Sequence, residues 1–593
     1  MKAPSPLPES QPPEIPTGSE RARFPKLKFP VTLIAIYWLL YVIAANIEKP
    51  YFYGFLYQMG SAALFALCFL GWWWFNRGIS LLEKSVGFAL IFGGALLAVR
   101  FSHRSISFPT LLSAGIPLVA SLVVLWILAA KRKFISSSRI TLVLLAGIAW
   151  SYFLLIRSDG VNSALKAETR WRWTPSAEEL FLARKPGGTE KQNPSQTSPV
   201  SPAASISTEW TGFRGPARDG VVRGMKIATD WKKTPPEQIW RHPVGPAWSS
   251  MTVIGNRLYT QEQRGDKEAV VCYDALTGSQ IWTHGDVTRF EEAVSGVGPR
   301  STPTFDSGRI LTLGATGILN CLDAATGNVV WSRDIKQDSG AKAPLWGFSC
   351  SPLVVDQKVV VYAGGDSDKG LLAYRLESGE LLWGAPAGQS SYSSAQFATL
   401  AGMPQFLMLH DSGLTSFDPA DGKKLWETGL VIKGAPRCGQ PRLIGENKLA
   451  VGALDGPGVT LLEVTKAGDR WNVSRLWTSR DLKPEFPDFV VHKAHAYGFD
   501  VSIFCCLNLA DGKRTWKEGR FGCGQVILLD DQALLLVISE TGEAILLAAD
   551  PQAQKELGRF QAVHGKTWNH PVLANGRLYV RNAEEMACYA IGF

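Results

Sequence analysis

A short repeated pattern that ends in tryptophan constrains the fold of this chain more than any other feature. The sequence CLDAATGNVVW at residues 321–331 has related copies at residues 272–282, 373–383, 416–426 and 506–516. Each copy keeps a glycine four residues before the final tryptophan. Self-similarity with a period of roughly 40 to 50 residues is typical of propellers and solenoids.

Each copy predicts a strand, a tight turn and a second strand, because alternating apolar residues flank a turn whose glycine supplies a positive φ. A second pair of short apolar segments precedes the copies, for example GRILTL at residues 308–313. Four short antiparallel strands make one propeller blade. Eight blades are predicted from a degenerate unit ending at residues 555–560, an incomplete last unit, and strands ending at Trp240, Trp282, Trp331, Trp383, Trp426, Trp477 and Trp516.

The two ends of the repeat region predict how the ring closes. The last unit, residues 569–593, lacks a tryptophan-ended strand, whereas QIWRHPV at residues 238–244 is such a strand without a blade of its own. We expect the early strand to complete the last blade, since closure leaves no open sheet edge.

The repeat resembles the tryptophan-docking motif of the PQQ-binding-like (quinoprotein dehydrogenase-like) β-propeller family, and the resemblance covers residues 210–593. In that family the tryptophan packs between neighbouring blades, which suits a large ring whose N–H needs a partner. The resemblance therefore implies a structural role for these tryptophans.

Five apolar runs precede the repeats, at about residues 30–47, 55–75, 85–99, 108–130 and 140–156. Their lengths predict an α-helical membrane domain of five transmembrane helices. Basic residues precede the first run and separate the second from the third and the fourth from the fifth, which places these segments in the cytoplasm. The prediction is a multi-pass inner (cytoplasmic) membrane protein with a cytoplasmic N-terminus and a periplasmic or extracellular propeller.

The predicted domains are a cytoplasmic tail (1–29), the five-helix transmembrane domain (30–157), a juxtamembrane helix with a Pro/Ser-rich linker (158–208) and the eight-bladed β-propeller (209–593). Thr174 is the expected N-cap of the juxtamembrane helix and Pro175 its first residue. The net charge is +9, but the propeller half has no concentrated basic patch, so we expect no nucleic-acid partner.

The cysteines and histidines predict no disulfide and no metal site. The cysteines recur at equivalent positions of different blades, and adjacent Cys505 and Cys506 would point to opposite faces of a strand. The sequence predicts that His492 and His495 lie on one strand, on opposite faces, which does not suit a metal. The chain has no phosphate loop, nucleophile elbow or zinc motif, so its catalytic residues are unknown.

The residues that open each innermost strand should converge on the propeller axis, where propeller ligands bind. The candidates are Trp248, Arg300, Tyr392, Arg437, Lys493, Trp568 and His570. Aromatic and cationic groups around a concave axis suit a planar anionic ligand, and the alternative is a water-filled channel.

Two functions follow from the resemblance. Five spans followed by an external propeller resemble the membrane-bound PQQ glucose dehydrogenases, which use PQQ and a divalent ion such as calcium to oxidise a sugar or alcohol and reduce membrane quinone. The compact propeller resembles BamB-type scaffolds, whose partners are envelope proteins. Blades of about 45 residues leave little room for the loops that build a catalytic pocket. We therefore favour a membrane-anchored extracytoplasmic binding or scaffold module, with the PQQ-dependent oxidoreductase as the alternative.

Overall fold

The structure is a computed structural model that describes residues 27–46, 51–106, 108–131, 139–163, 167–184, 209–365, 367–430, 437–453 and 458–592. It divides into two compact units. One unit holds the helical segments up to Leu154, and the other holds the chain from Leu155 onward together with the connecting residues 43–57 and 103–106.

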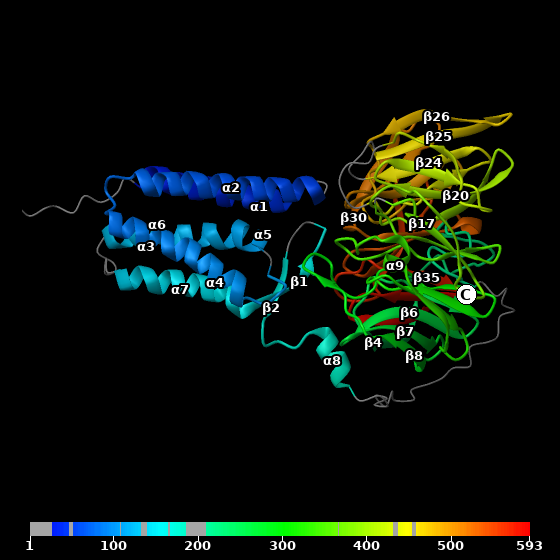
Figure 1. Cartoon of the computed structure of the whole chain (residues 1–593), viewed down its shortest axis with the longest axis horizontal. Coiled ribbons are helices and arrows are strands. Elements are labelled where there is room, and N and C mark those ends of the chain that lie inside the picture. Colours follow the sequence, from blue (N-terminus) through cyan, green and yellow to red (C-terminus); the bar gives the residue numbers. More distant parts are fainter. Residues whose placement is uncertain are drawn as a thin grey trace, which may run out of the picture. The chain divides into compact units, whose positions relative to one another are not determined.

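The first unit consists of long apolar helices that run side by side (Figure 1). Two of them contain a single π-helical turn, η1 or η2. The elements are α1 (Lys28–Asn46), α2 (Tyr51–Phe75), α3 (Leu81–Phe88), η1 (Ala89–Gly93), α4 (Gly94–Phe101), α5 (Phe108–Thr110), η2 (Leu111–Gly115), α6 (Ile116–Lys131) and α7 (Arg139–Leu155).

A helix lies at each of the five predicted apolar runs, and three are candidate membrane spans by length and composition: Gly54–Phe75, Leu81–Phe101 and Phe108–Ala129. The other two, Lys28–Ala44 and Ile140–Leu155, are apolar but shorter. Large apolar side chains such as Leu67 and Leu96 are 69% and 72% exposed. An apolar exterior of this kind suits a membrane.

The second unit contains the predicted eight-bladed β-propeller, with four antiparallel strands in each blade. Blades one to four contain β5 (Thr252–Ile254), β6 (Arg257–Arg264), β7 (Lys267–Asp274) and β8 (Gln280–Asp286); β11 (Thr304–Asp306), β12 (Arg309–Leu313), β13 (Ile318–Asp323) and β14 (Val329–Asp334); β15 (Leu353–Val355), β16 (Lys358–Tyr362), β17 (Leu371–Arg375) and β18 (Leu381–Ala385); and β19 (Gln396–Leu400), β20 (Met403–His410), β21 (Gly413–Phe417) and β22 (Lys424–Glu427).

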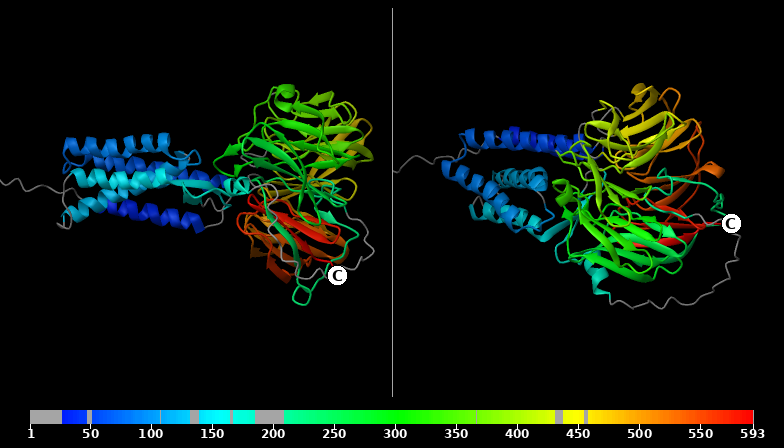
Figure 2. Two further views of the ribbon diagram at one scale, coloured as in Figure 1. Left: turned by 90° about the horizontal axis from the view of Figure 1, so that it is seen from below. Right: turned by 45° about the vertical axis from the view of Figure 1, so that its right-hand side comes forward.

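The blades follow one another around the ring in chain order (Figure 2). Blades five to eight contain β23 (Arg442–Ile444), β24 (Lys448–Ala453), β25 (Gly458–Ala467) and β26 (Arg470–Ser479); β27 (Val490–His492), β28 (His495–Asp500), β29 (Ile503–Asn508) and β30 (Arg514–Arg520); β31 (Gln525–Leu529), β32 (Leu534–Ile538), β33 (Glu543–Ala548) and β34 (Lys555–Gln561); and β35 (Val572–Ala574), β36 (Arg577–Arg581), β37 (Glu585–Ala590) and β4 (Glu237–Pro243). The short strand β3 (Val221–Val222) adds to blade seven, parallel to β31.

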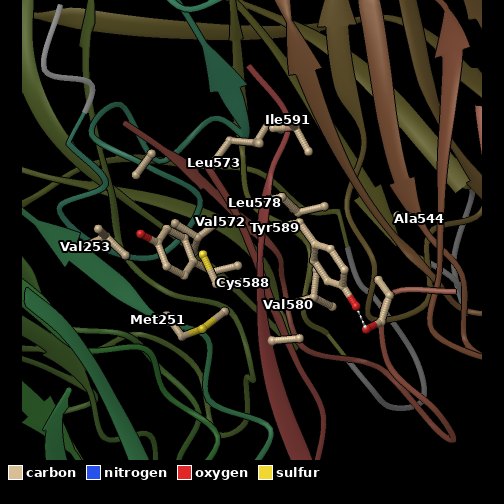
Figure 3. Packing of buried hydrophobic residues seen from close by; sticks show 14 of the residues in the cluster. Met251, Val253, Ala544, Val572, Leu573, Leu578, Val580, Cys588, Tyr589 and Ile591 are labelled. Carbon is tan, nitrogen blue, oxygen red and sulfur yellow. Dashed lines mark hydrogen bonds between the residues drawn. The ribbon is translucent and has the colours of Figure 1, made fainter. Parts of the chain in front are cut away.

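The ring closes as predicted, because β4 pairs antiparallel with β37 and completes blade eight. Apolar side chains from blades seven, eight and one then form one continuous buried cluster (Figure 3). Within it, Tyr589 donates its hydroxyl to the Ala562 carbonyl at 2.6 Å. The last blade thus shares a buried core with its two neighbours, although its strands are far apart in sequence.

The packing between blades explains why glycine and tryptophan recur together. Gly327, in the turn after β13, has a φ of 76°, and a Cβ there would lie 2.5 Å from Cε3 of Trp282 in the preceding blade. The Trp282 indole N–H donates to the Ala324 carbonyl of the same turn at 3.2 Å. The glycine is therefore required twice, for a positive φ and for close contact with a buried ring.

Several smaller elements complete the second unit. The strands β1 (Ile156–Val161) and β2 (Ala167–Trp171) form a hairpin that the sequence did not predict. The juxtamembrane helix α8 (Ala177–Ala183) exists, but its N-cap is Ser176, which forms a capping box with Glu179, and not Thr174. The remaining elements are β9 (Glu291–Glu292), β10 (Gly296–Val297), α9 (Ile335–Ser339) and the 3-10 helix η3 (Asp530–Gln532).

All nine cysteines are free thiols, as the repeat spacing predicted. Cys505 and Cys506 belong to two different buried clusters, in agreement with their opposite faces. The assignment of His492 and His495 to one strand was wrong, because they face each other across β27 and β28. Lys493, in the turn between them, has a φ of 53° without being glycine or asparagine, so no typical turn residue marks this turn in the sequence.

Candidate functional site

The N-terminal segment of the propeller, residues 209–220, lies across the central channel. Trp210 exchanges backbone hydrogen bonds with Val253 of blade one, at 2.9 Å each. Arg218 donates to the carbonyls of Ser351 and Pro352 in blade three, both at 3.0 Å. Arg214 is buried and forms an ion pair with Asp488 of blade six. This segment therefore connects three blades that are not neighbours and forms the floor of an axial cavity, in whose wall Phe213 and Arg214 lie.

A row of small hydroxyl side chains from blades one to four lies beside the floor, in the wall of the cavity. The hydroxyl of Thr302 accepts from the Ser250 N–H (3.3 Å), that of Ser351 from the Thr302 N–H (2.9 Å), and that of Ser394 from the Ser351 N–H (2.9 Å). Each hydroxyl thus satisfies a buried amide of the preceding blade. These side chains link successive blades, and we call them the hydroxyl belt.

Five aromatic side chains, the aromatic belt, form much of the remaining wall: Trp248, Trp346, Tyr392, Phe486 and Trp568. The ring centroids of Trp248 and Trp568 lie 4.8 Å apart, as do those of Phe486 and Trp568. Those of Trp346 and Tyr392 lie 5.2 Å apart. The cavity between the belts has a volume of about 210 Å³. Its wall is therefore rich in aromatic rings that could stack on a ligand.

The β1–β2 hairpin also contributes to this cavity, because Asn162 and Ser163 lie in its wall. The Ser163 N–H donates to Oε1 of Glu540 at 2.8 Å, and the Ser163 hydroxyl donates to the other carboxylate oxygen. The Trp568 indole N–H donates to the same Oε1 at 2.9 Å. Glu540 thus joins the hairpin to the aromatic belt.

Lys566 makes a second link between the hairpin and the belt. Its ammonium lies 4.8 Å from the Trp568 ring centroid and 5.3 Å from that of Trp248. It donates to the carbonyls of Val161 (3.1 Å) and Asp159 (3.4 Å) in β1. Burial lowers the pKa of Lys566, although neighbouring carboxylates oppose the shift.

Sequence comparison relates the repeats to a known protein family. Residues 228–343 and 266–518 match the family model described as outer membrane protein assembly factor BamB. Together with the eight repeat-built blades, this match decides the family. The chain belongs to the PQQ-like β-propeller family. No curated protein sequence matches the chain significantly.

Solved structures similar to this PQQ-like propeller include BamB from Moraxella catarrhalis, with 16% identity and a TM-score of 0.44 over 60% of this chain and 99% of that one. The quinohemoprotein alcohol dehydrogenase from Comamonas testosteroni has 13% identity and a TM-score of 0.38 over 66% of this chain and 81% of that one. A europium-containing methanol dehydrogenase has 12% identity and a TM-score of 0.36, over 65% of this chain and 98% of that one.

Five of the seven predicted axis residues lie in the cavity wall: Trp248, Arg300, Tyr392, Trp568 and His570. Arg437 is beside the cavity, where its guanidinium donates to the Ser390 hydroxyl at 2.8 Å, and its neighbour Cys438 lines the wall instead. Lys493 is exposed in the β27–β28 turn, so its assignment to the axis was wrong. The axial residues of blade six are Glu485, Phe486 and Asp488, because the innermost strand of this blade, β27, begins at Val490, earlier in the chain than the sequence suggested.

Arg300 holds a loop of the PQQ-like propeller in place. Its guanidinium donates to Glu292 (3.2 Å), to the Ser295 hydroxyl (3.1 Å) and to the Gly296 carbonyl (3.1 Å). It also lies 4.6 Å from the centroid of the Phe290 ring. Burial lowers the pKa of Arg300 to about 10. These contacts brace the loop that carries β9 and β10.

His570 and Tyr392 are electrically neutral at ordinary pH. Burial, with a smaller effect of Arg214, lowers the pKa of His570 to about 3. Burial raises the pKa of Tyr392 to about 12. Nδ1 of His570 lies 2.8 Å from the Pro571 carbonyl, which assigns its proton to Nδ1. Neither side chain supplies a charge for a ligand.

With the hairpin in place, the cavity does not fit PQQ, a planar molecule with several carboxylates. Arg214, Arg300 and Lys566 are each engaged by carboxylates or carbonyls of the protein. Glu485 and Asp488 add negative charge to the wall. The volume of about 210 Å³ also lies below the range of roughly 300–1,000 Å³ that is usual for ligand pockets. In the described residues, no group of three or more His, Cys, Asp or Glu side chains is arranged to hold a metal ion.

Proposed function

We propose that this protein is a membrane-anchored, extracytoplasmic PQQ-like β-propeller that acts as a binding or scaffold module. One observation carries the proposal: the cationic side chains at the axial cavity are engaged in contacts that hold the propeller together. Arg214 connects blade six to the floor, and Arg300 braces the loop between blades one and two. Groups used in this way stabilise a scaffold and leave little charge to organise a redox cofactor.

The anchor in this proposal is the helical unit, with all five apolar helices crossing the inner membrane. The two shorter helices are each near spanning length, and a short apolar stretch is accommodated by local thinning of the bilayer. The pattern of basic residues supports a cytoplasmic N-terminus and an external propeller. The corresponding partners are the bilayer and other envelope proteins.

A titration with PQQ tests the proposal. The full-length chain in detergent should bind PQQ weakly or not at all, even with calcium, and should not reduce an artificial acceptor when given sugars or alcohols. Stoichiometric uptake of PQQ followed by turnover of such a substrate would establish the oxidoreductase instead, with membrane quinone as the electron acceptor.

Arg300→Gln and Arg437→Gln serve as matched variants in that titration. Arg300 lines the cavity, whereas Arg437 lies beside it. If an anionic cofactor does bind at the axis, Arg300→Gln should weaken it more than Arg437→Gln. If there is no such cofactor, both variants should leave the weak background unchanged.

A further inference from the structure

The contacts between the hairpin and the propeller are made mainly by the peptide backbone of the hairpin. Carbonyls of Asp159 and Val161 accept from Lys566, and the N–H groups of Val161 and Ser163 donate to the Val294 carbonyl and to Glu540, both at 2.8 Å. Two side chains also take part: the Ser163 hydroxyl donates to Glu540, and the Arg170 guanidinium lies 3.6 Å from Oε1 of Glu584. The propeller therefore recognises features that an extended polypeptide with a small hydroxyl residue would share.

The backbone of the hairpin approaches the propeller closely at Gly160. Its φ is 100°, and a Cβ there would lie 2.7 Å from the Val294 carbonyl oxygen and 2.8 Å from the Lys566 ammonium. A side chain at this position would push the hairpin away from the propeller. The propeller surface beside Val294 and Lys566 therefore accommodates a chain that has glycine at this point.

The second strand of the hairpin contacts the propeller through Arg170, whose guanidinium lies 3.6 Å from Glu584. Most side chains of β2 are exposed, including Arg170 and Trp171. The hairpin also begins at Ile156, directly after the last residue of α7. The hairpin belongs to the same chain as the propeller, which gives it a higher effective concentration at this site than a free peptide would have.

We propose that the mouth of the axial cavity is a binding site for an extended peptide loop of a partner protein, and that the hairpin occupies this site as an internal ligand. This rests on the proposed role as a binding module, and it identifies the partner's chemistry: a glycine-containing turn with carbonyl groups for Lys566 and a hydroxyl for Glu540. A partner loop gains the site, and the aromatic belt beneath it, when the hairpin withdraws.

Cys438 provides a native reporter of the state of the cavity. It lies in the cavity wall, and among the nine cysteines only it and Cys68 are not fully buried. Burial raises the pKa of Cys438 to about 12, so alkylation in the closed state should be slow. A Cys68→Ser background removes the other reactive thiol.

The test uses full-length protein in detergent and compares Gly160→Ala with Gly296→Ala. Gly296 has a similar φ of 88°, but a Cβ there would meet nothing closer than 3.9 Å. Gly160→Ala should accelerate maleimide labelling of Cys438 by about tenfold or more, since a tenfold change corresponds to the loss of one or two hydrogen bonds. Gly296→Ala should stay close to the wild type, and Cys438→Ser should abolish the signal.

The second measurement uses a fluorescent synthetic peptide with the sequence of residues 156–171. It should bind Gly160→Ala about tenfold more tightly than the wild type, because the internal hairpin competes in the wild type. It should also slow Cys438 labelling in Gly160→Ala, whereas a peptide carrying Ser163→Ala should do so less.

Equal Cys438 labelling in the wild type and Gly160→Ala would overturn the proposal, as would faster labelling without any binding of the peptide. Neither measurement involves PQQ. A failure here therefore differs from a failure of the scaffold function, which the PQQ titration detects.

Discussion

The contact between the repeat glycine and the tryptophan of the preceding blade can be tested with two glycines of the same blade. Gly327 and Gly308 both have a φ of 76°. A Cβ at Gly327 would lie 2.5 Å from Trp282, whereas a Cβ at Gly308 would meet nothing within 4 Å. Substitution by alanine therefore imposes the same backbone penalty at both positions and a steric clash at one.

The expected losses of unfolding free energy follow from the backbone penalty and the steric clash. Alanine in the left-handed region costs about 1–2 kcal/mol, which is the expected loss for Gly308→Ala. Overpacking a well-filled contact adds about 1–3 kcal/mol, so Gly327→Ala should lose roughly 2–5 kcal/mol of unfolding free energy. Trp282→Ala alone should cost about 3–5 kcal/mol. In the Trp282→Ala background the clash is absent, and Gly327→Ala should cost only the backbone term.

Urea unfolding of the full-length chain in detergent, followed by the circular dichroism of the β-sheets, measures these differences. Equal destabilisation by Gly327→Ala and Gly308→Ala would show that the glycine is needed for its φ alone. If Gly327→Ala lost as much unfolding free energy in the Trp282→Ala background as in the wild type, the clash with Trp282 would likewise be refuted.

Three further predictions concern packing, thiols and topology. Trp331→Ala should cost about 3–5 kcal/mol in the same assay, since Trp331 is buried and its N–H donates to the Leu376 carbonyl at 2.8 Å; unchanged unfolding would contradict this packing. The nine cysteines should all react as free thiols when the protein is unfolded without reductant, and any stoichiometric pairing would refute the spacing argument. A reporter fused after Arg139 should lie in the cytoplasm and one fused at Thr189 outside it, which a protease-protection assay on sealed vesicles can check.

The repeat predicted the propeller well because its signal is physical. The glycine and tryptophan of neighbouring blades contact each other at five places, so most blades carry both residues. The strand at residues 238–244 could be assigned to the last blade because that blade lacks a tryptophan-ended strand of its own. The residues of the candidate site were harder to predict, since they lie in loops of unequal length before the innermost strands. Trp346 and Phe486 were missed for this reason, and Lys493 was misplaced by the unmarked β27–β28 turn.

The hairpin could not have been found from its sequence. Residues 156–161 read IRSDGV, which lacks the alternation of a half-buried strand. Its position depends on the Val294 carbonyl, Glu540 and Lys566, which are distant in the chain. The floor was missed for a similar reason, because Arg214 and Arg218 find their partners in blades six and three.

The pairing of β4 with β37 has a consequence for how the protein is made. The strand that completes the ring, β4, is translated before the four antiparallel strands of each of blades one to seven, and its partner β37 is translated after them. Until then β4 presents an unpaired edge, and such edges invite aggregation and proteolysis. A chain that stops before residue 585 would lack β37 altogether and leave blade eight without the strand that joins its two halves. Closure of the ring thus depends on translation through β37, since only then can β4 bury its edge.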